Sequence, residues 1–263
     1  MKVSSTNLAL VTVDALRYDS AINANTPNLT DLIKKHHSEG PDNWVKVGAH
    51  GTYTLPAHIS MFQAGILPSM NLPHLKAPYN RNYVKLFRAQ LNWTRNNKAL
   101  YPTPEAPNIV KGFSQLGYRT VGVGGVHWFN NKYETSKEIW NQYFDEFYWD
   151  ESFAEENKNC FENQLAFLSK LNLTSKKLPL FFFLNVAATH FPYLGFEKSV
   201  SGQMKAFEYV DSHFPALLSL LPRPLHLLIM ADHGECFGED GLWEHSCYHP
   251  MVMEVPMISV ELT

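Results

Sequence analysis

The chain has 263 residues, of which 45% are hydrophobic and 13% aromatic, a composition typical of a globular protein and not of a disordered one. Its 22 basic and 25 acidic residues give a net charge of −3 without a basic block, which argues against nucleic acid or an anionic membrane as a partner. This length suits one large α/β domain, so we expect residues 1–263 to form a single domain.

Three cysteines, Cys160, Cys236 and Cys247, show no CxxC spacing. An odd count without such spacing argues against a disulfide framework and favours a reducing compartment. Cys236 and Cys247 are expected to be packing residues, with a metal or redox role as the alternative. The apolar runs near the N-terminus and at 178–188 are too short to span a membrane, so we expect a soluble cytoplasmic protein without a membrane partner. The sequence does not indicate an oligomeric state.

Apolar runs and amphipathic segments alternate along the chain. Apolar, β-branched runs predict strands at residues 8–13, 45–47, 118–123, 180–186, 225–230 and 255–260. Helical patterns and start signals predict helices at 28–36, 56–64, 108–116, 137–144, 157–171 and 203–221. Residues 66–106, rich in Pro, Asn and Arg, are expected to form an irregular surface excursion or lid. The alternation predicts an α/β three-layer sandwich with a mostly parallel central sheet.

The segment Asp232-His233-Gly234-Glu235 comes almost directly after the apolar run at 225–230. This places a carboxylate and an imidazole at the carboxyl end of a strand, where open α/β sheets keep their active sites. Asp14 ends the first predicted strand in the same way; alone it would be read as a cap or turn residue. Together the three side chains form a mixed O/N donor set that suits Zn²⁺ or Mn²⁺. Glu235 is expected to accept the other imidazole N–H of His233.

Thr54 stands in Gly51-Thr52-Tyr53-Thr54-Leu55-Pro56-Ala57-His58, just before a helix with Pro near its first turn. Its hydroxyl would face free backbone N–H groups and the positive end of the helix, where a phosphate or sulfate oxyanion binds well. A metal bound to that oxygen would lower its pKa and generate a nucleophile. The alternative is a threonine that only caps the helix.

Six motifs follow one another: VDALR, TLPAH before a helix, GYRT with a following His, THFPY, YVD in a helix, and DHGE followed by GEDGLW and VPMI. In this order they resemble the sulfatase-like branch of the alkaline phosphatase superfamily. The resemblance runs from about Leu8 to Ile258. It implies an alkaline-phosphatase-like sandwich, and we expect the C-terminal subdomain typical of sulfatases to be missing.

The resemblance implies that Asp14, Asp232 and His233 hold a metal and that Thr54 is a further ligand and the nucleophile. Sulfatases carry at that position the cysteine that is converted to formylglycine. The other residues implied are histidines: His190 and His245 in catalysis, and His58, His127 and His249 in substrate binding.

Departures from the sulfatase pattern shift the expected chemistry. Ala15 replaces the second Asp of an Asp-Asp pair, and His233 stands where sulfatases more often have Asn. Fewer carboxylates and an imidazole favour Zn²⁺ or Mn²⁺ over Ca²⁺. Val186 stands where a two-metal site needs an Asp, so one divalent transition metal is expected. His245 and His249 are the alternative ligands for a second metal.

The sequence therefore predicts a metal-dependent hydrolase of small-molecule phosphoric mono- or diesters that acts through a phosphothreonine intermediate at Thr54. Transfer of the phosphoryl group to an alcohol is an open variant of this reaction. Two alternatives remain: a sulfuric-ester hydrolase with an unmodified Thr54, and a catalytically disabled binding protein on the same fold. The organic part of the substrate has no signature in the sequence.

Overall fold

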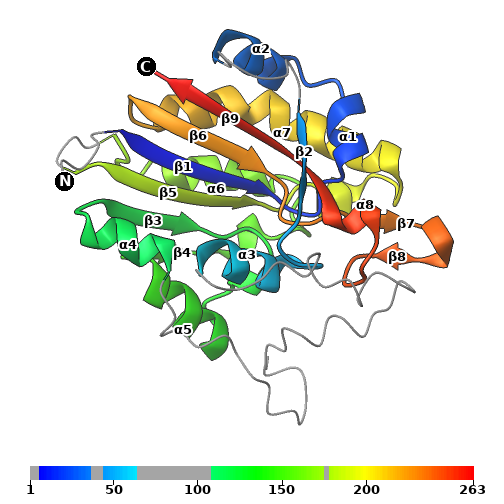
Figure 1. The fold of residues 1–263 in the computed structure, drawn as a ribbon, viewed down its shortest axis with the longest axis horizontal. Helices are drawn as coiled ribbons and strands as arrows, with labels where there is room; N and C mark the ends of the chain where they lie inside the picture. Colours follow the sequence, from blue (N-terminus) through cyan, green and yellow to red (C-terminus); the bar gives the residue numbers. More distant parts are fainter. Residues whose placement is uncertain (1–5, 37–43, 64–107, 175–177) are drawn as a thin grey trace.

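A central sheet organises the computed structural model, which describes residues 6–36, 44–63, 108–174 and 178–263. Within these ranges the sheet has seven strands in the order β2-β9-β6-β1-β5-β3-β4 (Figure 1). The strands are β1 Asn7–Val13, β2 Val45–Gly48, β3 Arg119–Val123, β4 Glu146–Tyr148, β5 Leu180–Val186, β6 Leu225–Met230 and β9 Glu254–Leu262. Strands β4, β3, β5, β1 and β6 pair in parallel, whereas β9 is antiparallel to both β6 and β2. The predicted mostly parallel sheet is confirmed.

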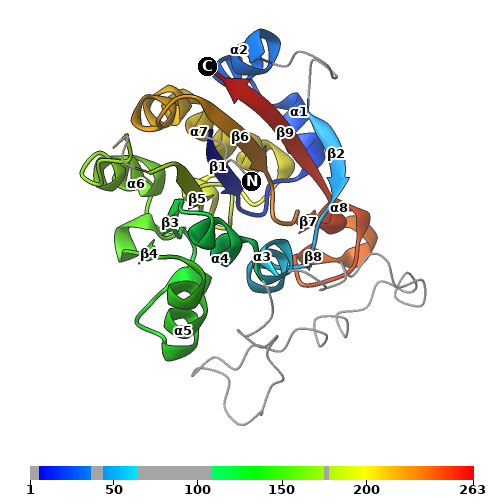
Figure 2. The ribbon, with the colours of Figure 1, turned by 60° about the vertical axis from the view of Figure 1, so that its left-hand side comes forward.

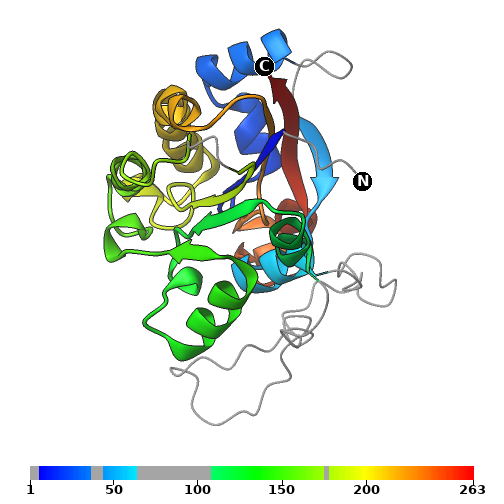
Figure 3. The ribbon, with the colours of Figure 1, turned by 90° about the vertical axis from the view of Figure 1, so that its left-hand side faces the viewer.

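Helices cover both faces of the sheet, as the turned views show (Figures 2 and 3). One layer holds α1 Tyr18–Asn23, α2 Pro27–His36, α6 Cys160–Leu168 and α7 Val200–Leu220, and the other holds α3 Thr54–Phe62, α4 Ile109–Gln115 and α5 Glu134–Tyr143. Alternation along the strands creates the two faces: in β5, Phe181 stacks on Phe113 of α4 and Phe183 contacts Phe62 of α3, while Phe182 points to the opposite side. The predicted α/β sandwich is thus confirmed.

Short elements gather where the parallel strands end. They are the hairpin strands β7 Cys236–Phe237 and β8 Trp243–Glu244, the helix α8 Pro250–Met253, and the 3-10 turns η4 His127–Phe129, η5 Glu151–Phe153, η6 Tyr193–Gly195 and η7 Glu239–Gly241. The hairpin and α8 lie at the arrowhead end of the sheet in Figure 1. This edge carries the loops in which the candidate site residues stand.

The structure refines several predicted boundaries. Strands β5 and β6 coincide with the predicted runs, but α7 begins at Val200, three residues before the predicted start, and α3 begins at Thr54. The sequence missed β4 and the β7–β8 hairpin, because strands of two or three residues leave no readable periodicity. The expected excursion at 66–106 lies outside the described residues.

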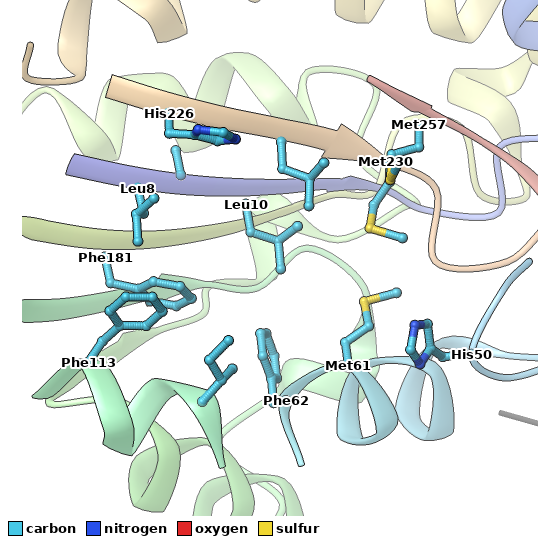
Figure 4. A pocket seen from close by; sticks show the side chains of 13 residues that line it. Leu8, Leu10, His50, Met61, Phe62, Phe113, Phe181, His226, Met230 and Met257 are labelled. Carbon is cyan, nitrogen blue, oxygen red and sulfur yellow. The ribbon is translucent and has the colours of Figure 1, made fainter. Parts of the chain in front are cut away.

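An apolar cavity of about 390 Å³ lies between the sheet and helices α3 and α4 (Figure 4). Its walls include Leu10 of β1, Met61 and Phe62 of α3, Phe113 of α4 and Met230 of β6. None of the predicted catalytic or metal-binding residues lines it. Across the described ranges, the helices are too short or too polar to cross a membrane.

The start of α2 depends on a carboxylate from α7. Asp211, 2% exposed, accepts hydrogen bonds from the backbone N–H groups of Asn28 and Leu29 at 3.2 and 2.7 Å. We expect Asp211→Ala to lower the free energy of unfolding by about 2 kcal/mol, because buried donors lose their acceptor. Urea unfolding followed by circular dichroism measures this loss. Glu208→Ala removes a similar but exposed bond to Asn25 and should cost about 0.5 kcal/mol or less; equal losses in the two variants would contradict the assignment.

Candidate active site

The order of the central strands brings distant residues to one edge of the sheet. Asp14 directly follows β1, Asp232 and His233 follow β6, and His190 follows β5. Because β1 lies between β5 and β6, the loop that carries Asp14 is a neighbour of both other loops. Parallel pairing places all these carboxyl ends at the same edge.

Asp14, Asp232 and His233 form one cluster of fully buried side chains. His233 Nε2 lies 3.7 Å from Asp14 Oδ1 and 3.6 Å from Asp232 Oδ2. One candidate ligand atom from each residue can be chosen so that all lie within 4.8 Å of one another. The three predicted ligands are therefore close enough to bind a single ion.

The hydrogen bonds of this cluster leave lone pairs facing one another. His233 Nδ1 contacts the Gly234 carbonyl oxygen at 2.9 Å; since that oxygen can only accept, Nδ1 carries the proton and Nε2 presents a lone pair. Asp232 Oδ1 accepts from the N–H groups of Ala15 and His233, but Oδ2 is buried without a hydrogen-bond partner among the described residues. A cation between Nε2 and the carboxylates would satisfy these groups, so the donor set fits a metal.

Burial dominates the electrostatics of the cluster. It raises the pKa of Asp14 to about 7, with the nearby Asp232 carboxylate adding to the effect, and raises the pKa of Asp232 to about 6. Burial also lowers the pKa of His233 to about 4, which keeps the imidazole neutral, the form that binds metals. Asn185 opposes the shift at Asp14 by donating a hydrogen bond to Oδ2 at 3.0 Å.

Thr54 places a hydroxyl group against this cluster. As the first residue of α3 it is fully buried, and its Oγ1 lies 3.4 Å from Asp14 Oδ2 and 3.4 Å from His233 Nε2. The preceding loop packs closely on the helix: a Cβ on Gly51 would lie 2.6 Å from the Ala57 nitrogen. The hydroxyl is thus held at a helix N-terminus beside the candidate metal-ligand atoms.

His58 lies one turn further along α3 and beneath the cluster. Its Nδ1 donates to the Thr54 carbonyl oxygen at 2.7 Å, and its Nε2 accepts from Thr12 Oγ1 at 2.9 Å. Burial lowers the pKa of His58 to about 3, and its ring packs edge-on against Phe129 and Phe183. With both ring nitrogens bonded to protein groups, this placement favours positioning of Thr54 over contact with substrate.

His245 joins the cluster from the segment after β8. Its ring centroid lies 4.5 Å from that of His233 and 5.2 Å from that of His190. The fully buried Glu235 lies 3.3 Å from its Nδ1. Although burial alone lowers the pKa of His245, the Glu235 carboxylate raises it above its usual value. The expected bond from His233 to Glu235 is wrong, because the nearby Gly234 carbonyl takes that N–H and leaves Glu235 to orient His245.

The remaining two predicted histidines have other surroundings. His127 of η4 is half-buried, and its Nδ1 lies 3.3 Å from Glu155 Oε1. His249 caps α8, where its Nδ1 accepts from the Met251 N–H at 3.1 Å and its Nε2 lies 3.4 Å from Asp240 Oδ2. The structure therefore brings His190 and His245 to the Asp14 cluster, and places His127 and His249 with protein partners of their own.

Comparisons with known proteins rest on structure alone. No family model and no curated protein matches the chain by sequence. A protein of the alkaline phosphatase superfamily from Vibrio parahaemolyticus is similar over 97% of this chain, with 13% identity and a TM-score of 0.55. The chain has the fold of the alkaline phosphatase superfamily. The predicted resemblance is confirmed at the level of the fold.

Two further structures match this superfamily fold. The soluble domain of lipooligosaccharide phosphoethanolamine transferase A from Neisseria meningitidis matches 99% of this chain and 78% of its own, with 13% identity and a TM-score of 0.61. The C-terminal periplasmic domain of EcEptC from Escherichia coli, a complex with Zn, matches 97% and 72%, with 13% identity and a TM-score of 0.58. The chain spans 61% of the Vibrio protein's length. Nothing in these matches tests the predicted cytoplasmic location.

Metal binding should stabilise the protein through Asp232. We expect Zn²⁺ at about 100 times its dissociation constant to add about 2.7 kcal/mol and to raise Tm by about 5–10 °C. In Asp232→Asn the part of the rise that comes from this site should vanish, because the carboxylate that carries the unpartnered oxygen is gone. Thermal unfolding of chelator-treated protein with and without Zn²⁺ measures both. Asp240→Asn, an exposed aspartate paired with His249, serves as the control; equal shifts in the two variants would refute the site.

Proposed function

We propose that this chain is a metal-dependent enzyme that hydrolyses or transfers phosphoric esters, with Thr54 as nucleophile. The observation that carries the proposal is the position of the Thr54 hydroxyl, 3.4 Å from both Asp14 Oδ2 and His233 Nε2 at the N-terminus of α3. A hydroxyl that only capped the helix would have no need of the Asp14 carboxylate and the His233 imidazole beside it. The superfamily fold supports the same class of chemistry by analogy.

The residues that would hold the metal are Asp14, Thr54, Asp232 and His233. Their oxygen and nitrogen atoms suit Zn²⁺ or Mn²⁺, and a structure with this fold is a Zn complex. When bound, the metal would make the Thr54 oxygen more acidic and would offset negative charge on the phosphoryl oxygens.

The first half of the reaction forms a phosphothreonine. Thr54 Oγ1 loses its proton to water and attacks phosphorus in line, and the bond from phosphorus to the leaving oxygen breaks. His190 Nδ1 donates to the Phe191 carbonyl oxygen at 2.9 Å; in the imidazolium form the ring carries a second proton on Nε2, which it gives to the leaving oxygen. His245, whose pKa the Glu235 carboxylate raises, would donate a hydrogen bond from its protonated ring to a non-bridging oxygen. The proton lost from Thr54 and the proton given by His190 balance.

The second half releases the phosphoryl group. A water molecule gives one proton to His190 Nε2 and attacks the phosphorus of phosphothreonine, the bond to Thr54 Oγ1 breaks, Oγ1 regains a proton from solvent, and inorganic phosphate or a phosphomonoester leaves. An alcohol in place of that water turns hydrolysis into transfer. Because Thr54 is fully buried, we expect the acceptor alcohol to reach the phosphothreonine from the edge of the sheet where His190 and His245 lie.

Substitution of Thr54 tests the proposal directly. We expect Thr54→Val, which keeps the shape but removes the hydroxyl, to lower phosphoesterase activity by about 10³-fold or more. Thr54→Ser keeps the hydroxyl and should retain measurable turnover. Steady-state assays with aryl phosphates, aryl phosphodiesters and aryl sulfates measure the rates, and mass spectrometry of quenched wild-type protein detects phosphothreonine. Full activity of Thr54→Val would contradict the proposal. If the wild type turned over only the aryl sulfates, sulfuric-ester hydrolysis would replace phosphoric-ester hydrolysis as the function.

A further inference from the structure

A second group of metal-ligand side chains lies at the same edge of the sheet, apart from the Asp14 cluster. It consists of His127, Glu155 and Glu156. His127 stands in η4 after β3, and the two glutamates follow η5, which comes after β4. Because β3 and β4 are neighbouring parallel strands, the fold brings His127 against Glu155 although 28 positions separate them.

The spacing of the donor atoms matches that of metal ligands. His127 Nδ1 lies 3.3 Å from Glu155 Oε1 and 3.7 Å from Glu156 Oε2, and one ligand atom from each residue falls within 4.8 Å of the others. Two ligands bound tetrahedrally at about 2.0–2.1 Å stand about 3.4 Å apart. The three side chains can therefore enclose one ion with little rearrangement.

The second carboxylate oxygen of Glu155 gives independent support for a bound cation. The side chain is 12% exposed, and its Oε2 is buried without a hydrogen-bond partner in the part of the chain that the structure describes. An ion pair between His127 and Oε1 leaves Oε2 unsatisfied, which is unfavourable for a buried carboxylate. A cation bound to Glu155 would remove that defect.

The surroundings of His127 hold its ring in place. Trp149 packs against it with ring centroids 5.5 Å apart, and the Trp149 indole N–H donates to the Gly125 carbonyl oxygen at 2.8 Å. His127 Nε2 faces Glu151 Oε1 at 4.0 Å, on the side where metal-bound imidazoles commonly have an acceptor. Lys132, which could have neutralised the cluster, pairs with Glu151 at 3.1 Å.

We propose that His127, Glu155 and Glu156 bind a second divalent transition metal ion, of the Zn²⁺ or Mn²⁺ kind. A neutral imidazole with two carboxylates is a donor set for these ions. The strand order β1-β5-β3 places the loop after β5, with His190, between the two metal clusters. His127 thereby becomes a metal ligand instead of the substrate contact expected from the sequence. The proposal does not depend on Thr54 acting as a nucleophile.

Metal stoichiometry tests this second site. Chelator-treated protein is titrated with Zn²⁺ alone in a calorimeter, and bound zinc is measured by elemental analysis after gel filtration. We expect two equivalents in the wild type, one in the double variant Glu155→Gln/Glu156→Gln, and one in Asp232→Asn. Glu162→Gln is the matched control, because Glu162 makes an ordinary ion pair with His213 at 2.9 Å; it should keep two equivalents. Circular dichroism of the metal-free variants establishes that each is folded.

The outcomes separate this proposal from the proposed function. One equivalent in the wild type that persists in the double variant and disappears in Asp232→Asn would overturn the second site and leave the Thr54 chemistry intact. Two equivalents in both the wild type and the double variant would also overturn it. Loss of one equivalent in the double variant, with Thr54→Val still fully active, would support the second site while refuting the proposed reaction.

Discussion

Two buried carboxyl groups and a neutral imidazole nitrogen lie close together at the end of the central strands. All three are hydrogen-bond acceptors, and the architecture of the site follows from the repulsion between them. Asp14, Asp232 and His233 each present lone pairs to the others. Like-charged carboxylates in a low-dielectric interior repel strongly. The fold tolerates this arrangement by surrounding it with donors, such as the Ala15 N–H and the Asn185 amide.

Helices from both layers of the sandwich form hydrogen bonds that hold the site residues in place. Beneath Thr54, His58 links the first turn of α3 to Thr12 of β1, so the helix that begins with Thr54 is fixed to the strand that Asp14 directly follows. On the other side, Gln203 of α7 donates to the carbonyl oxygens of Ala15 and Thr189 at 2.8 and 3.2 Å. Each helix layer thus holds one side of the site in place through these hydrogen bonds.

Much of the fold could be predicted because strands β5 and β6 appear in the sequence as near-continuous apolar runs that end in polar residues. The antiparallel direction of β9 could not be predicted, since strand direction leaves no mark on composition. Asp14, Asp232 and His233 could be singled out as candidate metal ligands because each lies just after a strand. The surroundings of His58 and the pairing of His127 with Glu155 were missed, because helix rotation and contacts between distant loops are set by tertiary packing and not by neighbours in sequence.

The close contact at Gly234 links the metal ligands to the end of the chain. A Cβ at this position would collide with the Met251 carbonyl oxygen, and the N–H groups of Gly234 and Glu235 donate to the carbonyl oxygens of Val252 and Met251. These hydrogen bonds connect the loop bearing His233 to α8, and β9 begins directly after α8. Local unfolding of the last strand would release this loop and, with it, Asp232 and His233, two of the four candidate metal ligands, so the candidate site would open together with the C-terminal segment.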